Sequence, residues 1–341
     1  MIGKANLKIY PWQNALWDKL RANKQTWPHA FLMHGPAGIG KLDFARHFSQ
    51  NLLCTEQNTS GACGVCPSCN WFNEGNHPDF KFVSPEQEDE ADSDALTAKK
   101  TKKKSQISIA QIRELADFTG LSSHRSGGMR IVLIHPAETL NNASANALLK
   151  MLEEPAQGVV FLLVTHQLQR LLATIVSRCQ KINMPMPSSA ESLAWLSDQG
   201  LSNAAAQLQY FAGSPIKAMT DTMQFSQSKD FLQLLAQGEG LSAHLAAPAL
   251  MVHSVEAGVI ALQKWLYDLV LMKQAKQVRY HVAYNHALEA LAKKAHLGKL
   301  MQLQKNLNDL RKLASHPLNH ELQMEALLVD YTRIFSKATA R

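Results

Sequence analysis

The sequence predicts an α/β domain built on a parallel sheet, followed by two all-helical domains, and three observations support this. A glycine-rich turn at 35–41 lies between a short apolar run and an amphipathic stretch. Further apolar runs alternate with helical patterns up to about residue 183. Beyond that point the strand signal disappears, and apolar residues recur at the spacing of a helix stripe. Strands that alternate with helices predict a parallel sheet covered on both faces.

The elements of the α/β domain, which we expect over residues 1–183, follow one another in a regular order. A strand is expected at 30–34, directly before the glycine-rich turn, and a helix at 42–53 after it. The later elements are a helix at 107–118, a buried strand at 130–134, a helix at 143–152 and a buried strand at 159–165. Pro185 and Pro187 mark a junction. After it we expect a small helical domain at 184–227 and a helical C-terminal domain at 228–341.

The composition is that of an ordinary core-forming protein. The 341 residues are 46% apolar and 18% charged, with a formal net charge of +7. No window approaches 18 uninterrupted apolar residues, and the N-terminal segment lacks the pattern of a signal peptide, so we expect a cytoplasmic protein. The basic excess permits contact with a nucleic acid without requiring it.

A block of opposite charges interrupts the α/β domain at 85–105. Acidic residues between 86 and 94 are followed by five lysines between 99 and 104, with almost no apolar residue among them. This composition predicts a disordered surface insertion. A lysine loop that contacts DNA is the alternative.

The glycine-rich turn fits the phosphate-loop pattern up to its last position. Gly35, Gly38, Gly40 and Lys41 match the residues whose amides and ammonium cradle phosphates. Leu42 stands where a serine or threonine hydroxyl would bind magnesium, and a leucine cannot do so. The pattern therefore indicates a nucleotide fold more strongly than it indicates activity.

The acidic residue that holds the metal at the end of a neighbouring strand is missing as well. The strand at 130–134 is followed by His135 and Pro136, and Glu138 lies three positions beyond the expected place. Because two magnesium-handling positions are lost, we expect hydrolysis to be very slow or absent. Residual nucleotide binding through Lys41 and an empty loop both remain open.

Four of the five cysteines are predicted to form a structural zinc site. Cys54, Cys63, Cys66 and Cys69 follow the spacing C-x8-C-x2-C-x2-C, which suits tetrahedral coordination by four thiolates. The alternatives are an iron–sulfur cluster or free thiols. No basic recognition helix follows, so a DNA-binding finger is disfavoured. Trp71 and Phe72 are expected to be packing residues, and Cys179 is expected to be buried.

Several segments resemble the AAA+ clamp-loader subunits of bacterial DNA polymerase III. Residues 146–155, NALLKMLEEP, are similar to a segment typical of that family, and Ser177, Arg178 and Cys179 match its Ser-Arg-Cys motif, which is expected after a strand. Shorter similarities lie at 76–79, 213–215, 317–319 and 325–328. Leu42, His135 with Pro136, and Ile216 replace residues of the hydrolysing motor subunits and match the delta-prime type, the stator.

The resemblance implies a role within an assembly. It implies an AAA+ domain with a zinc module at 54–69, a small helical lid, and a collar that oligomerises. It also implies that Arg178 acts in trans as an arginine finger on the ATP of a neighbouring motor subunit. The implied partners are the gamma/tau motor subunits, the delta subunit, the sliding clamp and primer-template DNA. Nucleotidyl transfer would belong to the polymerase assembly, and no intrinsic ATPase is expected.

Other interpretations remain open at this point. Arg178 could form a buried structural salt bridge. The chain could be an active motor subunit with unconventional metal ligands such as Glu138, or a free-standing zinc protein that binds DNA. Glu153 and Glu154 form a carboxylate pair, but their place at a predicted helix end, before Pro155, favours a structural role.

Overall fold

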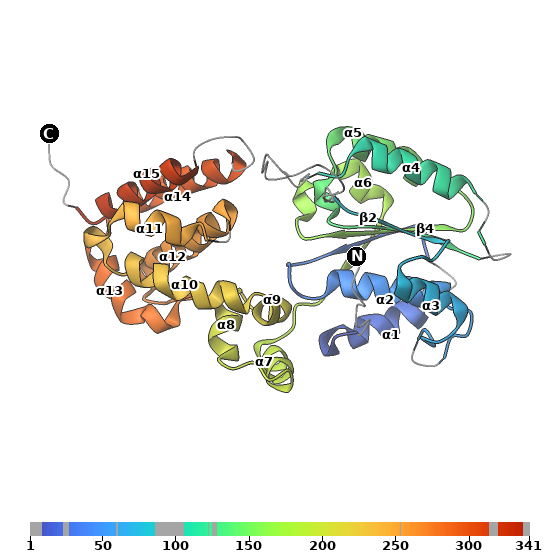
Figure 1. Cartoon of the computed structure of the whole chain (residues 1–341), viewed down its shortest axis with the longest axis horizontal. Helices are drawn as coiled ribbons and strands as arrows, with labels where there is room; N and C mark the ends of the chain where they lie inside the picture. The colour runs from blue at the N-terminus through green and yellow to red at the C-terminus, as the bar shows by residue number, and fades with distance from the viewer. Residues whose placement is uncertain are drawn as a thin grey trace, which may run out of the picture. The chain divides into compact units, whose positions relative to one another are not determined.

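The computed structural model describes residues 9–22, 27–58, 61–85, 106–121, 123–124, 128–252, 254–313 and 320–336. Its contacts divide the chain into two compact units, Met1–Pro187 and Ser188–Arg341 (Figure 1). The charged insertion predicted at 85–105 lies outside the described residues, apart from Pro85, and so does the similarity at 317–319.

The first unit is built on one parallel sheet of five strands in the order β2-β3-β4-β1-β5. The strands are β1 (Ala30–His34), β2 (Phe80–Val83), β3 (Arg130–Ile134), β4 (Val159–Thr165) and β5 (Gln180–Asn183). The strands predicted at 30–34, 130–134 and 159–165 are confirmed. The edge strands β2 and β5 were not predicted. Because β1 lies between β4 and the edge strand β5, the glycine-rich turn that follows β1 lies next to the ends of both strands.

Helices cover both faces of the sheet (Figure 1). They are α1 (Asn14–Ala22), α2 (Lys41–Leu53), α3 (Pro67–Glu74), α4 (Ile109–Gly120), α5 (Asn142–Glu153) and α6 (Ala173–Arg178). Two helix starts have side-chain caps: Ser108 forms a capping box with Gln111, and the Asn141 side chain accepts a hydrogen bond from Ser144 N. The expected helices at 42–53, 107–118 and 143–152 are found with ends shifted by one or two residues.

Successive strand residues alternate between two separate cores. In β1, Ala30 and Leu32 pack with α4, α5 and α6, whereas Phe31 and Met33 pack with α1, α2 and α3. The strands β3 and β4 alternate in the same way. A buried parallel strand presents both faces to helices, which is why these segments are apolar without interruption.

The second unit is all-helical. Its helices are α7 (Ser189–Asp198), α8 (Ala204–Tyr210), α9 (Pro215–Thr220), α10 (Thr222–Leu235), α11 (Ala243–Leu250), α12 (Val255–Ala275), α13 (Asn285–Lys294), α14 (Leu297–Leu313) and α15 (His320–Arg333). A small core joins α7, α8 and α9, and a larger core joins α10 to α15. Helix α10 runs through the boundary predicted at 227/228, and the division into two helical domains stays a prediction.

Buried polar side chains tie the helices of the second unit together. Lys264 Nζ on α12 donates to the carbonyl of Tyr210 on α8 (2.7 Å) and lies 4.0 Å from the centre of its ring. Burial lowers the pKa of Lys264 to about 8. Deeper in the unit, Trp265 Nε1 donates to the Tyr331 hydroxyl, which donates to the carbonyl of Leu235.

Among the described helices, none is by itself long and apolar enough to cross a membrane; the bent pair α11 and α12 passes only on length and composition.

Candidate functional site

The glycine-rich turn lies between β1 and α2, the place in the chain order where a phosphate loop is expected. It leaves β1 after His34 and ends at Gly40, which precedes α2 with a φ of 83° in the left-handed region. A Cβ at residue 40 would overlap the ring of Tyr10, so both the conformation and the space require glycine there.

Lys41, the residue that would reach phosphates, is turned back onto its own loop. It is 2% exposed, and its Nζ donates to the carbonyl oxygens of Gly35 (2.8 Å) and Pro36. Two of the three donors of the Lys41 ammonium group are therefore bonded to backbone carbonyls of the loop itself.

A segment from before α1 covers the same loop. We call residues 10–13 the N-terminal strap. The Gln13 amide donates to the carbonyls of Ile39 (2.9 Å) and Gly40 (3.1 Å), and Trp12 Nε1 also donates to Ile39 O (3.0 Å). The Tyr10 hydroxyl donates to an oxygen of Asp43 in the first turn of α2 (3.1 Å). The strap was not predicted, because its partners lie 26 to 33 residues further along the chain.

The position of the metal-binding acid is occupied by a different arrangement. His135 follows β3, and burial, together with Lys41 and Arg46 nearby, lowers its pKa. The carboxylate of Glu138 accepts hydrogen bonds from Thr165 Oγ1 (2.7 Å) and His166 N (3.1 Å) at the end of β4. Glu138 therefore joins the end of β3 to the end of β4, and Leu42 packs partly buried against the α1–α3 core.

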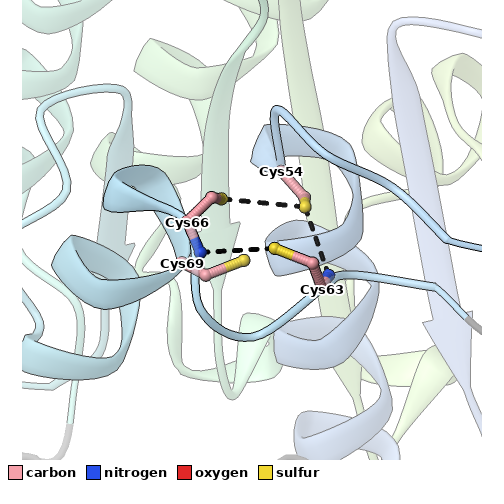
Figure 2. Close-up of side chains that lie close together, drawn as sticks. All are labelled: Cys54, Cys63, Cys66 and Cys69. Atoms are coloured by element: carbon pink, nitrogen blue, oxygen red, sulfur yellow. Dashed lines mark hydrogen bonds between the residues drawn. The ribbon is translucent and has the colours of Figure 1, made fainter.

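The four predicted metal ligands converge at the other end of α2. Cys54 is the C-terminal cap of α2, Cys66 the N-terminal cap of α3, and Cys69 lies in the first turn of α3. Their sulfur atoms and that of Cys63 all lie within 4.8 Å of one another, and Figure 2 shows the side chains directed toward a common point. Cys54, Cys66 and Cys69 are buried.

The donor set fits a tetrahedral zinc ion. Zinc–thiolate bonds of about 2.3 Å place the sulfurs of a tetrahedron about 3.8 Å apart, and Cys54 Sγ and Cys66 Sγ are 3.9 Å apart. Backbone N–H groups of Cys63 and Cys66 donate to the sulfurs of Cys54 and Cys63 (3.3 Å each), which stabilises thiolate charge. With four protein ligands, the centre leaves no position for a substrate, so a bound ion would have a structural role.

A buried histidine links this module to the sheet. His77 Nδ1 accepts the backbone N–H of Asp79 (3.0 Å), so Nε2 carries the proton and donates to Ser68 Oγ (2.8 Å). Ser68 in turn donates to the carbonyl of Leu53. The Asp79 carboxylate pairs with Arg130 of β3 (3.5 Å). The sequence similarity at 76–79 includes His77 and Asp79, but the sequence did not indicate that they connect the cysteine module to β3.

The two aromatic residues of α3 differ in their surroundings. Phe72 is buried in the α1–α3 core and contacts Phe80, as expected. Trp71 is 40% exposed, and its ring packs on two histidines, His124 and His77, at the surface and not in the core.

Arg178 lies at the surface. It is the last residue of α6, immediately before Cys179 and β5, so the motif lies at the end of a helix and before a strand, not after a strand as expected. Its Nη2 pairs with Glu153 Oε1 at the end of α5, and the two side chains are 36% and 42% exposed. The pair is a salt bridge, but it is not buried. Cys179 is buried, and burial raises its pKa to about 11.

These features define a class of protein: a phosphate-loop α/β fold whose loop lacks the magnesium-binding hydroxyl, with a four-cysteine centre and a helical second unit. A family model described as "DNA polymerase III, delta subunit" matches residues 12–188. DNA polymerase III subunit delta' of Pseudomonas aeruginosa is 33% identical over 96% of this chain and 98% of its own length. The Escherichia coli protein of that name is 33% identical over 62% of this chain and 60% of its own. The chain belongs to the family of DNA polymerase III delta-prime subunits.

A solved structure also resembles the chain. A gamma subunit-related protein of DNA polymerase III from Thermotoga maritima has a TM-score of 0.46 and 14% identity, over 94% of this chain and 99% of its own.

Proposed function

We propose that this chain is the non-hydrolysing stator of a AAA+ clamp loader, and that it supplies Arg178 to the ATP site of a neighbouring motor subunit. One observation carries the proposal: the chain has Leu42 and His135 at the two positions where a nucleotide site needs ligands for magnesium, while Arg178 is exposed at the end of α6. Family membership supplies the context of DNA polymerase III.

The loop geometry supports the absence of intrinsic hydrolysis. Lys41 is bonded to loop carbonyls, Leu42 offers no ligand for magnesium, and both oxygens of Glu138 accept hydrogen bonds at the end of β4. Phosphoryl transfer depends on a bound metal ion, and Leu42 offers no oxygen ligand to hold one. The rival interpretation, a motor subunit that uses Glu138, would require that carboxylate to bind magnesium while it also accepts hydrogen bonds from Thr165 and His166.

The exposure of Arg178 supports its action in trans. A guanidinium presents five donors in a planar fork that matches phosphate oxygens, and it keeps its charge at any physiological pH. From the neighbour's side, such a group would stabilise the negative charge that spreads over the transferring phosphoryl group. In the proposed complex, this chain has no nucleotide chemistry of its own.

The remaining parts of the proposal concern assembly. The cysteine module would hold zinc as a structural ion. Helices α7–α9 would form the lid, and α10–α15 the collar that contacts the other subunits. The partners would be the gamma/tau and delta subunits, with the sliding clamp and primed DNA reached through the complex, in the cytoplasm.

Steady-state ATP turnover with clamp and primed DNA tests the proposal. The samples are this chain alone, the motor subunits with it, and the same mixture with Arg178→Ala. We expect no turnover by the chain alone, and turnover at the receiving site about 10³-fold lower with the variant. Arg170→Ala removes another exposed arginine of the same unit and should behave as the wild type.

Two results would contradict the proposal. Turnover by the chain alone that is abolished by Lys41→Ala would make it a motor subunit. Equal turnover with wild-type chain and Arg178→Ala would reduce Arg178 to a structural residue.

A further inference from the structure

The Arg178 guanidinium is held by its own chain on more than one side. Nη2 pairs with Glu153, and Nη1 donates to the carbonyl of Thr174 (3.1 Å) and to Ser177 Oγ (3.4 Å). In this position the fork faces α5 and α6. A phosphate on another subunit could bind it only by replacing some of these contacts.

The position of Glu153 is not explained by the stability of its own helix. Glu153 is the last residue of α5, and the C-terminal end of a helix dipole disfavours a carboxylate. Packing of α5 on α6, through Leu148, Leu152 and Ile175 in a common core, brings Glu153 to the end of α6. The exposed side chain of the next residue, Glu154, makes no hydrogen bond or ion pair within the described part of the chain.

We propose that Glu153 is a positioning residue that holds the Arg178 guanidinium in a parked position on α5 and α6 until a nucleotide phosphate of the neighbouring subunit displaces the carboxylate. This rests on the proposed function of Arg178 as a finger in trans. The exchange replaces one anionic acceptor with another, so the guanidinium stays paired with an anion before and after it moves.

The exposure of Glu153 and Arg178 determines how strongly their ion pair can hold the guanidinium. An ion pair between side chains that are 36% and 42% exposed is weak, and it changes an equilibrium by at most about fivefold. A contact of this strength can be displaced by a phosphate but is strong enough to populate the parked position. Breaking the pair between Glu153 and Arg178 costs free energy, and this cost makes the net binding of ATP weaker. The pair therefore raises the KM for ATP and leaves kcat unchanged.

Four variants in the assembled complex test the inference through the KM and kcat for ATP. Glu153→Gln should lower KM by about two- to fivefold with kcat unchanged. Glu153→Asp keeps the charge and should stay close to the wild type. Glu154→Gln makes the same change one residue away and should have no effect. In the Arg178→Ala background, Glu153→Gln should cause no further change.

A second measurement follows the pair in the isolated chain. The NMR signals of the Arg178 side-chain nitrogens should shift on Glu153→Gln and not on Glu154→Gln. This readout needs no partner and no turnover. Identical spectra for both variants would overturn the parked position.

The outcomes separate this inference from the proposed function. If Arg178→Ala lowers turnover while Glu153→Gln matches the wild type, the finger stands and the parking is wrong. A fall in kcat on Glu153→Gln would also overturn it, because Glu153 would then hold Arg178 in the productive position. A change in KM that persists with Arg178→Ala would show that Glu153 repels the nucleotide directly. If Arg178→Ala has no effect, both proposals fail.

Discussion

The two ends of helix α2 are both built like ligand sites, and they differ in how their polar groups are satisfied. At the N-terminal end, loop carbonyls accept hydrogen bonds from Lys41, Trp12 and Gln13 of the same chain. At the C-terminal end, four cysteine sulfurs converge, and backbone N–H groups donate to two of them. Four thiolates so close together need a cation. The hydrogen bonds at the N-terminal end are completed by neutral carbonyls and donors of the chain itself, whereas the thiolates at the C-terminal end leave a concentration of negative charge that the chain does not neutralise.

The largest effect should follow loss of metal at the C-terminal end. Cys69→Ser removes one of the four proposed zinc ligands, so we expect the variant to retain no zinc and to lose about 4 kcal/mol or more of stability. Metal analysis of the purified chain and thermal unfolding with and without a chelator measure this. Cys179→Ser makes the same change at a buried thiol outside the cluster and should leave the zinc content unchanged. Full stability in the metal-free chain would show that the cluster needs no ion.

A smaller effect is expected from Lys41→Met at the N-terminal end. The variant leaves the carbonyls of Gly35 and Pro36 without the lysine donor, at a cost of about 1–3 kcal/mol. Turnover of the assembled complex should not change, because the loop carries no nucleotide chemistry in the proposed function. Denaturant unfolding and ATP turnover check the two parts. A large fall in turnover at unchanged stability would show that Lys41 takes part in ATP turnover and does not only bond to the loop carbonyls.

The smallest expected effect is on the pH dependence of the unfolding free energy, through His135 near the glycine-rich loop. Burial lowers the pKa of His135, whereas the unfolded chain takes up a proton near the ordinary value of about 6.5. The stability that comes from neutral His135 is therefore present above pH 6.5 and is lost as the pH falls toward the lower folded value. One such group contributes at most about 1.4 kcal/mol per pH unit.

His135→Asn should remove this part of the pH dependence and leave the slope above pH 7.5 unchanged, where the histidine is neutral in both states. Unfolding free energies measured between pH 5 and 8 check it. An unchanged slope below pH 6.5 would show that His135 becomes protonated in the folded chain.

The sequence predicted the central strands of the sheet and not its edges, for a physical reason. The strands β1, β3 and β4 are buried on both faces, and they are continuous apolar runs apart from one polar residue at an end of each, His34, Arg130 and Thr165. The edge strand β5, Gln180–Asn183, has only Ile182 buried, so its composition carries little strand signal. The strand β2 has four residues, and only Val83 is buried.

The candidate sites were predictable where local spacing defines them. The cysteine ligands lie within 16 residues, and their spacing alone gave the set that the structure brings together. The strap over the loop and the pairing of Glu153 with Arg178 depend on packing between distant segments, so no local pattern contains them. The surroundings of Trp71 could not be predicted for the same reason, since its ring stacks on His124, which is distant in the sequence.

The alternation of β1 between two cores has a consequence for how this protein can diverge. Helices α5 and α6, which carry Glu153 and Arg178, pack on one face of the sheet, and α2 and α3, with the loop and the cysteine module, pack on the other. Even-numbered positions of β1 therefore face one set of helices and odd-numbered positions the other. Changes in the packing behind the glycine-rich loop can therefore be accommodated on their own face of the sheet, apart from the face on which α5 and α6 carry Glu153 and Arg178.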